Sequence, residues 1–183
     1  NNFDNDALKI LKNKKNLKLI EPSNFNPNNF LKFTSVSENI LFQTEDTKFF
    51  SKKDFQIVSK KKPTKSQLND LIFAFNICRY VKSNAIVLAS NKTTIGIGSG
   101  QPSRLDSCQI AIDKMRKFKV SHTDIVAASD AFFPFVDGIE KLVQSGVKAV
   151  IQPSGSINDK KIIKFANETN TVLIFSKTRH FKH

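Results

Sequence analysis

The chain has 183 residues, of which 39% are apolar, and its 29 Lys and Arg against 16 Asp and Glu give a formal net charge of +13. This length suits one compact domain, or one domain with part of another. No apolar run approaches the roughly 20 residues that span a bilayer, and no basic stretch followed by an apolar one marks a signal peptide, so we expect a cytoplasmic protein with no membrane partner.

The positive charge raises the question of nucleic acid. The lysines, however, are scattered through every segment, and their densest clusters, 12–15 and 60–62, lie near predicted boundaries where solvated charge is usual. We therefore expect no nucleic-acid partner and keep a basic nucleic-acid-binding module as an alternative. A basic surface would equally attract phosphorylated small molecules.

Residues 1–63 carry only short elements. Apolar spacing predicts a helix over 4–15. Apolar runs bounded by turn residues predict four strands, at 17–20, 30–36, 40–44 and 55–59. The strands 30–36 and 40–44 suit a hairpin. Because no long helix separates these strands, this third of the chain reads as the end of a unit begun upstream.

The organisation changes at Thr64, which forms a capping box with Gln67 and opens an amphipathic helix that reaches Cys78. A second such helix follows Ser103 and buries Cys108, so we expect both cysteines to be reduced core residues. The remaining elements are strands 85–89, 94–98, 125–128, 147–151 and 171–175, with helices 136–144 and 158–167. This alternation predicts an α/β fold with a largely parallel sheet, its first two strands forming a hairpin.

Residues 129–137, Ser-Asp-Ala-Phe-Phe-Pro-Phe-Val-Asp, lie between a predicted strand and helix, where open α/β sheets place ligands. Three phenylalanines and a proline between two aspartates are unusual for an exposed turn. They suit an apolar shelf for a flat, polar-edged ligand. The alternative is that the phenylalanines fill the core beneath the loop.

The glycine-rich segment 96–101 lacks the third glycine of a dinucleotide-binding turn, since Gln101 takes that place. Either its backbone approaches an anionic or planar ligand, with Arg104 just behind it, or it is a glycine-rich hairpin leaving the sheet. The tail 179–183 ends in Arg-His-Phe-Lys-His, and Arg179 suits bidentate phosphate binding. No Cys-x-x-Cys or His-x-Glu occurs, so we expect no catalytic metal.

Five segments, in order and spacing, resemble the C-terminal part of the AICAR transformylase/IMP cyclohydrolase family of purine biosynthesis. They are 82–87, 94–104, 129–135, 151–156 and 179–183. The resemblance implies a folate-dependent formyltransferase. Formyl would pass from the co-substrate N10-formyltetrahydrofolate to the 5-amino group of phosphoribosylaminoimidazolecarboxamide (AICAR). It also implies a cytidine-deaminase-like three-layer α/β/α unit without zinc at 64–183, preceded at 1–63 by the end of a second similar unit and a connection.

Matching positions assign the site residues. Asn84 and His183 would serve catalysis, Asn84 as the donor that stabilises the oxyanion at the formyl carbon. The resemblance implies AICAR contacts from Asn84, Arg104, Phe132 and Arg179. It implies folate contacts from Leu105, Pro134, Asp137, Ser156 and Ile157.

The chain departs from the family pattern in two respects. The family's adjacent Lys-His catalytic pair belongs to a motif upstream of this region and is not among these residues, and neither is the cyclohydrolase domain, so we expect this chain alone to be inactive. Val136 stands where bacterial relatives carry Arg, next to Asp137, which is kept. The resemblance further implies a homodimer with interfacial active sites. A fragment with a binding role only remains an alternative.

Overall fold

The computed structural model describes residues 3–21, 31–117 and 123–183. The chain divides into two compact units, residues 1–47 and residues 48–183, and each is described by itself. No helix within the described ranges is long and apolar enough to cross a membrane.

Within its described residues, the first unit contains one short helix and one hairpin. Helix α1 (Asn5–Leu11) begins at Asp4, whose side chain accepts a hydrogen bond from the backbone N–H of Asp6. Strands β1 (Leu31–Val36) and β2 (Asn39–Thr44) pair antiparallel, which confirms the predicted hairpin. The predicted strand at 17–20 is wrong, because these residues find no pairing strand in the described part of this unit.

The second unit is built on a six-stranded sheet. Its strands are β3 (Phe55–Ile57), β4 (Ile86–Ser90), β5 (Thr93–Gly98), β6 (Val126–Ser129), β7 (Ala149–Pro153) and β8 (Val172–Ser176), in the order β3-β8-β7-β6-β4-β5. Only β6–β7 and β7–β8 are parallel pairs, so the prediction of a largely parallel sheet is wrong and the sheet is mixed. The crossover after β5 does place β6 parallel to β5. However, β4 lies between them and gives β6 an antiparallel neighbour.

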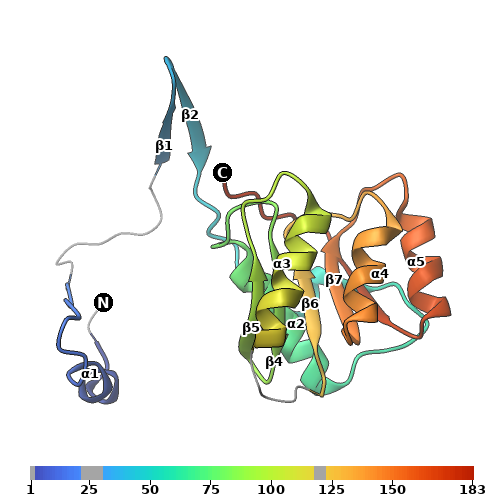
Figure 1. Ribbon diagram of the computed structural model, residues 1–183, viewed down its shortest axis with the longest axis horizontal. Helices are drawn as coiled ribbons and strands as arrows, with labels where there is room; N and C mark the ends of the chain where they lie inside the picture. The colour runs from blue at the N-terminus through green and yellow to red at the C-terminus, as the bar shows by residue number, and fades with distance from the viewer. Residues whose placement is uncertain (1–2, 22–30, 118–122) are drawn as a thin grey trace. The chain divides into compact units, whose positions relative to one another are not determined.

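Helices cover both faces of this sheet (Figure 1). Helix α2 (Lys65–Cys78) packs on β4, β6 and β7, whereas α3 (Arg104–Lys117), α4 (Val136–Gln144) and α5 (Asp159–Glu168) lie against the opposite face. Successive side chains of β4 point to opposite faces of the sheet, so the strand contributes to a hydrophobic core on each face. Leu88 faces the α3 side and Val87 faces the α2 side. The predicted three-layer α/β/α architecture is confirmed.

The compact unit begins at Lys48, before the boundary expected after residue 63. Strand β3 joins the sheet by pairing antiparallel with β8, and Phe50 is buried in the core under α2. Residues 48–63 therefore belong physically to the second unit. The division into subdomains at residue 63, and the origin of residues 1–47 in a second similar unit, stay predictions.

Two glycines of β5 let helix α3 lie directly on the strand. A Cβ built on Gly96 would lie 2.1 Å from the carbonyl oxygen of Ala111, and one on Gly98 would lie 1.9 Å from that of Ser107. Contacts this short are impossible, so any side chain here would push the helix away. Of the two interpretations of segment 96–101, the structure supports the hairpin, with the glycines serving helix packing.

Both cysteines are free and buried, as predicted. Burial raises the pKa of the Cys78 thiol well above its ordinary value, and it raises the pKa of Cys108 from 9.0 to about 12. Thiolates are the reactive form, so neither side chain should react while the protein is folded.

We expect no reaction of either thiol with a disulfide reagent at pH 8 in the native state and complete reaction of both in denaturant.

The raised pKa of the Cys108 thiol also makes the stability of the fold depend on pH. The unfolded Cys108 thiol loses its proton near pH 9.0, while the folded one keeps it to about pH 12. Stability should therefore fall by about 1.4 kcal/mol per pH unit in that window through this group. Denaturant titrations of the wild type and Cys108→Ala at pH 8 and pH 10 measure it, and an identical pH dependence in both would contradict it.

Candidate functional site

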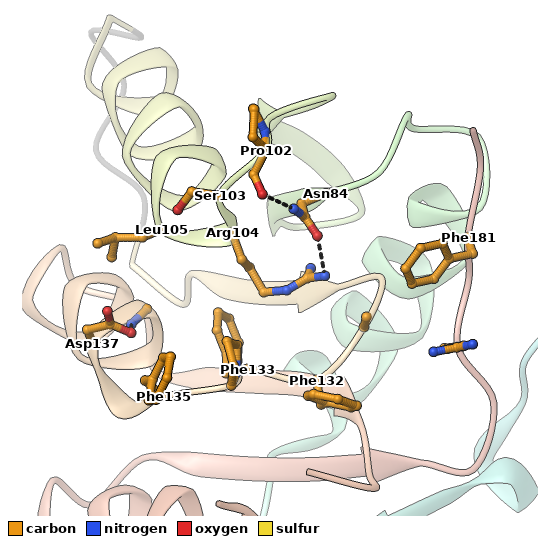
Figure 2. Close-up of a pocket in the computed structure, with 14 residues that line it drawn as sticks. Asn84, Pro102, Ser103, Arg104, Leu105, Phe132, Phe133, Phe135, Asp137 and Phe181 are labelled. Atoms are coloured by element: carbon orange, nitrogen blue, oxygen red, sulfur yellow. Dashed lines mark hydrogen bonds between the residues drawn. The ribbon is translucent and has the colours of Figure 1, made fainter. Parts of the chain in front are cut away.

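A cavity of about 490 Å³ opens at the edge of the sheet where β6 ends and β4 begins (Figure 2). Antiparallel pairing places Ile86 of β4 beside both Ser129 of β6 and Gly98 of β5, so three strands bring their ends to one place. Four segments line the cavity. They are Asn84, two residues before β4, the start of α3, the loop from β6 into α4, and the C-terminal tail.

Arg104 is held at the floor of this site by a buried ion pair. Its Nη1 donates to the carboxylate of Asp130 and to Ser129 Oγ, the latter over 2.9 Å, and its Nη2 donates to Asn84 Oδ1 over 2.6 Å. Asp130 is only 1% exposed and also accepts a hydrogen bond from the Ser83 hydroxyl. These bonds leave Nε–H and one Nη2 hydrogen of Arg104 without an acceptor in the described ranges, so they are free for a ligand.

The amide of Asn84 faces Arg104 with its oxygen (Figure 2). Its Nδ2 donates to the backbone carbonyls of Gln101, over 2.9 Å, and of Pro102, over 3.0 Å. Both amide hydrogens are therefore already in use. The predicted role of Asn84 as a donor to the oxyanion requires one of these bonds to be exchanged, whereas its oxygen directly orients Arg104.

The phenylalanines of segment 129–137 divide between the two roles considered for them. Phe133 is fully buried in the core, and Gly138 lies so close that a Cβ there would be 2.7 Å from the Phe133 ring. Phe132 is half-buried and Phe135 is 64% exposed, and both line the cavity. Phe133 also lines the cavity (Figure 2), so one ring both fills the core and borders the cavity, and the two more exposed rings extend the shelf.

The C-terminal tail supplies the remaining wall. Arg179 and Phe181 both line the cavity, and the guanidinium of Arg179 lies 4.9 Å from the centre of the Phe181 ring. Such a contact is a cation–π interaction. Arg179 is exposed, so its hydrogen-bond donors are accessible from the cavity.

The structure brings together seven of the ten residues expected at the site. These are Asn84, Arg104, Leu105, Phe132, Pro134, Asp137 and Arg179. Ser156, Ile157 and His183 do not line the cavity. Ser156 and Ile157 lie in the loop after β7, which reaches the shelf where Asn158 Nδ2 donates to the Pro134 carbonyl over 2.6 Å. His183 lies at the chain end, its ring 4.8 Å from that of Phe181.

Several residues of the site were missed by sequence reasoning. Asp130 had been noted only as a flanking carboxylate, yet it is the partner of Arg104. Phe181 stood within the tail without an assigned role. Its signal was its place between two polar residues of the tail in which Arg179 was expected to bind phosphate. No local pattern could have identified Asp130 as the partner of Arg104. Val136, which stands where bacterial relatives carry Arg, lies at the start of α4 and packs partly buried against the core.

Within the described ranges, no three His, Cys, Asp or Glu side chains gather as a metal site would require. The polar side chains of the cavity are instead two arginines, one amide, one hydroxyl and the single carboxylate of Asp137, over an aromatic shelf. This combination suits a planar ligand that carries an anionic group.

A family model described as the AICARFT/IMPCHase bienzyme matches residues 1–114. The chain belongs to this family. Among curated relatives, the bifunctional purine biosynthesis protein PurH of Fusobacterium nucleatum is 46% identical over 181 residues. The match covers 99% of this chain. PurH of Buchnera aphidicola is 44% identical over 183 residues, again with 99% of this chain covered.

The chain spans 35% of the length of these two relatives. A solved structure of dCMP deaminase from the cyanophage S-TIM5 aligns with 61% of this chain and 98% of its own, with 16% identity and a TM-score of 0.41. That likeness is weak, and the three-layer fold of this family member rests on the strand order and helix placement described above.

Proposed function

We propose that this chain is the C-terminal part of a bifunctional enzyme of purine biosynthesis and forms a part of its AICAR formyltransferase site. The AICARFT/IMPCHase family combines two activities, AICAR formyl transfer and IMP cyclohydrolysis, and this chain could contribute to either. The observation that favours formyl transfer is the cavity, where seven residues expected to bind AICAR and folate converge. The cyclohydrolase activity of the intact protein would belong to the part that is absent here.

In this proposal Arg179 binds the phosphate of AICAR, and Phe132 packs against its imidazole ring. The free N–H groups of Arg104 face the reacting centre, and Asp137, at the first turn of α4, marks the folate side. The 5-amino nitrogen attacks the formyl carbon of N10-formyltetrahydrofolate. The bond from that carbon to N10 breaks, the amine loses a proton and N10 gains one.

The work of these residues is orientation and charge stabilisation. The acceptor amine is a weak nucleophile because its lone pair is delocalised into the ring. Proton transfer would rest with the Lys-His pair that this chain lacks. We therefore expect the chain to bind ligands weakly, to be inactive alone, and to act as a cytoplasmic homodimer when joined to the rest of the protein.

Calorimetry with AICAR tests the proposal. The wild-type chain should bind, and Arg179→Ala should weaken binding by about 10- to 100-fold, the loss expected for a hydrogen bond to a charged group. Phe132→Ala should weaken it by a similar factor through lost ring contact. Arg116→Ala, an exposed arginine at the far end of α3, removes the same charge and should leave binding unchanged.

Equal losses in Arg179→Ala and Arg116→Ala would show that only net charge matters and would remove the specific site. Salt-sensitive binding to random oligonucleotides, without binding of AICAR or a folate analogue, would replace the proposal with a nucleic-acid-binding function. Light scattering tests association, and a monomer at high concentration would contradict the expected dimer.

A further inference from the structure

The C-terminal tail after β8 alternates between the cavity and the protein interior. Arg179 and Phe181 line the cavity, whereas His180 between them is 0% exposed. The tail belongs to no strand or helix, so no regular hydrogen-bond ladder fixes its path. Individual contacts must therefore hold the tail in position, and its buried residue, His180, makes several of them.

His180 lies in an aromatic box under helix α2. Its ring centre is 4.9 Å from that of Phe50, edge to face, and 4.7 Å from that of Phe75. Phe55 closes the box by stacking on Phe50 at 6.1 Å. Contacts of this kind contribute beyond simple burial of apolar area. The imidazole is thus packed as a core side chain among phenylalanines from two separate segments, the stretch 50–55 and helix α2.

The backbone of His180 is anchored to the same element that holds Arg104. Its N–H donates to the carbonyl oxygen of Asp130 over 2.9 Å, while the Asp130 carboxylate pairs with Arg104. The two cavity arginines are therefore connected through one buried residue. Further along the tail, the Lys182 carbonyl accepts from the N–H of Ser83 over 2.9 Å.

We propose that His180 is the positioning residue of the tail, and that its packing in the box formed by Phe50, Phe55 and Phe75 holds Arg179 and Phe181 at the cavity. The residues on either side of a buried anchor have little freedom, so their side chains are presented to the ligand already oriented. Such preorganisation raises affinity by reducing the ordering needed on binding. The effect on the ligand rests on the proposed function, whereas the anchoring itself does not.

Hydrogen exchange without ligand tests the anchor directly. In the wild type, the His180 amide should be protected to the level of the β8 amides, because it is buried and bonded to Asp130. His180→Ala should speed exchange in 179–183 by about tenfold or more and leave β6 and β8 unchanged. His180→Phe keeps a ring in the box and should retain most of the protection.

Unchanged tail exchange in His180→Ala would overturn the proposal, and so would equal loosening of the sheet, which would indicate a general core role. His180→Phe behaving like His180→Ala would also count against it, because ring packing would not be the cause. If His180→Ala fails to fold, Phe50→Leu opens one wall of the box and should loosen the same amides. An unprotected His180 amide in the wild type contradicts the anchor without any variant.

Affinity for AICAR links the anchor to the site. His180→Ala should weaken binding by about tenfold, approaching the effect of Arg179→Ala, because the arginine remains but is no longer held in place. The double variant His180→Ala/Arg179→Ala should bind only slightly more weakly than Arg179→Ala alone, through Phe181, and much more tightly than the product of the two single effects predicts. Full additivity would show that His180 acts independently of Arg179. A wild type that binds no AICAR would refute the proposed function and leave the exchange result standing.

Discussion

Replacing Asp130 by Ala should lower the free energy of unfolding by about 3–5 kcal/mol, the cost of leaving a buried charge without its partner. Arg104 is almost fully buried, so its guanidinium charge would be left without a partner beside a cavity created by the substitution. The same variant frees the hydroxyl of Ser83. Chemical denaturation followed by circular dichroism measures the effect.

A double-mutant cycle separates the ion pair from other effects of Asp130. Because Arg104→Met/Asp130→Ala removes both charges, it should be more stable than the sum of the single changes predicts. Asp113→Ala is the matched control. Asp113 is an exposed aspartate on α3 that accepts a hydrogen bond from Gln109, and its loss should change stability by no more than about 0.5 kcal/mol. Additive losses in the cycle would contradict the pairing.

Sequence reasoning succeeded where the determinants are local. The capping box of Thr64 and Gln67 is present, with N–H to side-chain distances of 3.1 and 3.0 Å, and α2 starts immediately after Thr64. The hairpin of β4 and β5 also follows from residues near one another in the chain. In each case a few neighbouring residues decide the local geometry, so the sequence predicts it without knowledge of the tertiary structure.

Reasoning from sequence failed where distant segments meet. The pairing of β3 with β8 joins residues more than a hundred positions apart, and nothing in Phe55–Ile57 specifies that partner. The burial of His180 depends on Phe50 and Phe75, which approach only once the sheet and α2 are assembled. The site residues were located through the family resemblance, whereas the network around Asp130 required the structure.

Gly98→Ala should be destabilising by about 1–3 kcal/mol, because the new methyl group has no room beneath α3. The atom it meets is the backbone oxygen of Ser107, which cannot move without the helix. That helix also carries Arg104 in its first turn, so the substitution should weaken AICAR binding as well. Thermal denaturation and calorimetry on the same sample measure the two effects.

Gly96→Ala is the informative comparison. Its Cβ would meet the carbonyl oxygen of Ala111, one turn further along α3 and further from Arg104. The stability loss should be similar, but the loss of affinity should be smaller, since the displaced turn lies away from the cavity. Thr93→Ala, at the exposed start of β5, should affect neither property. If Gly96→Ala and Gly98→Ala weaken binding equally, the position of the first turn of α3 is not what sets Arg104 in the site. The restraint on Arg104 would then come from its side-chain bonds to Asp130, Ser129 and Asn84.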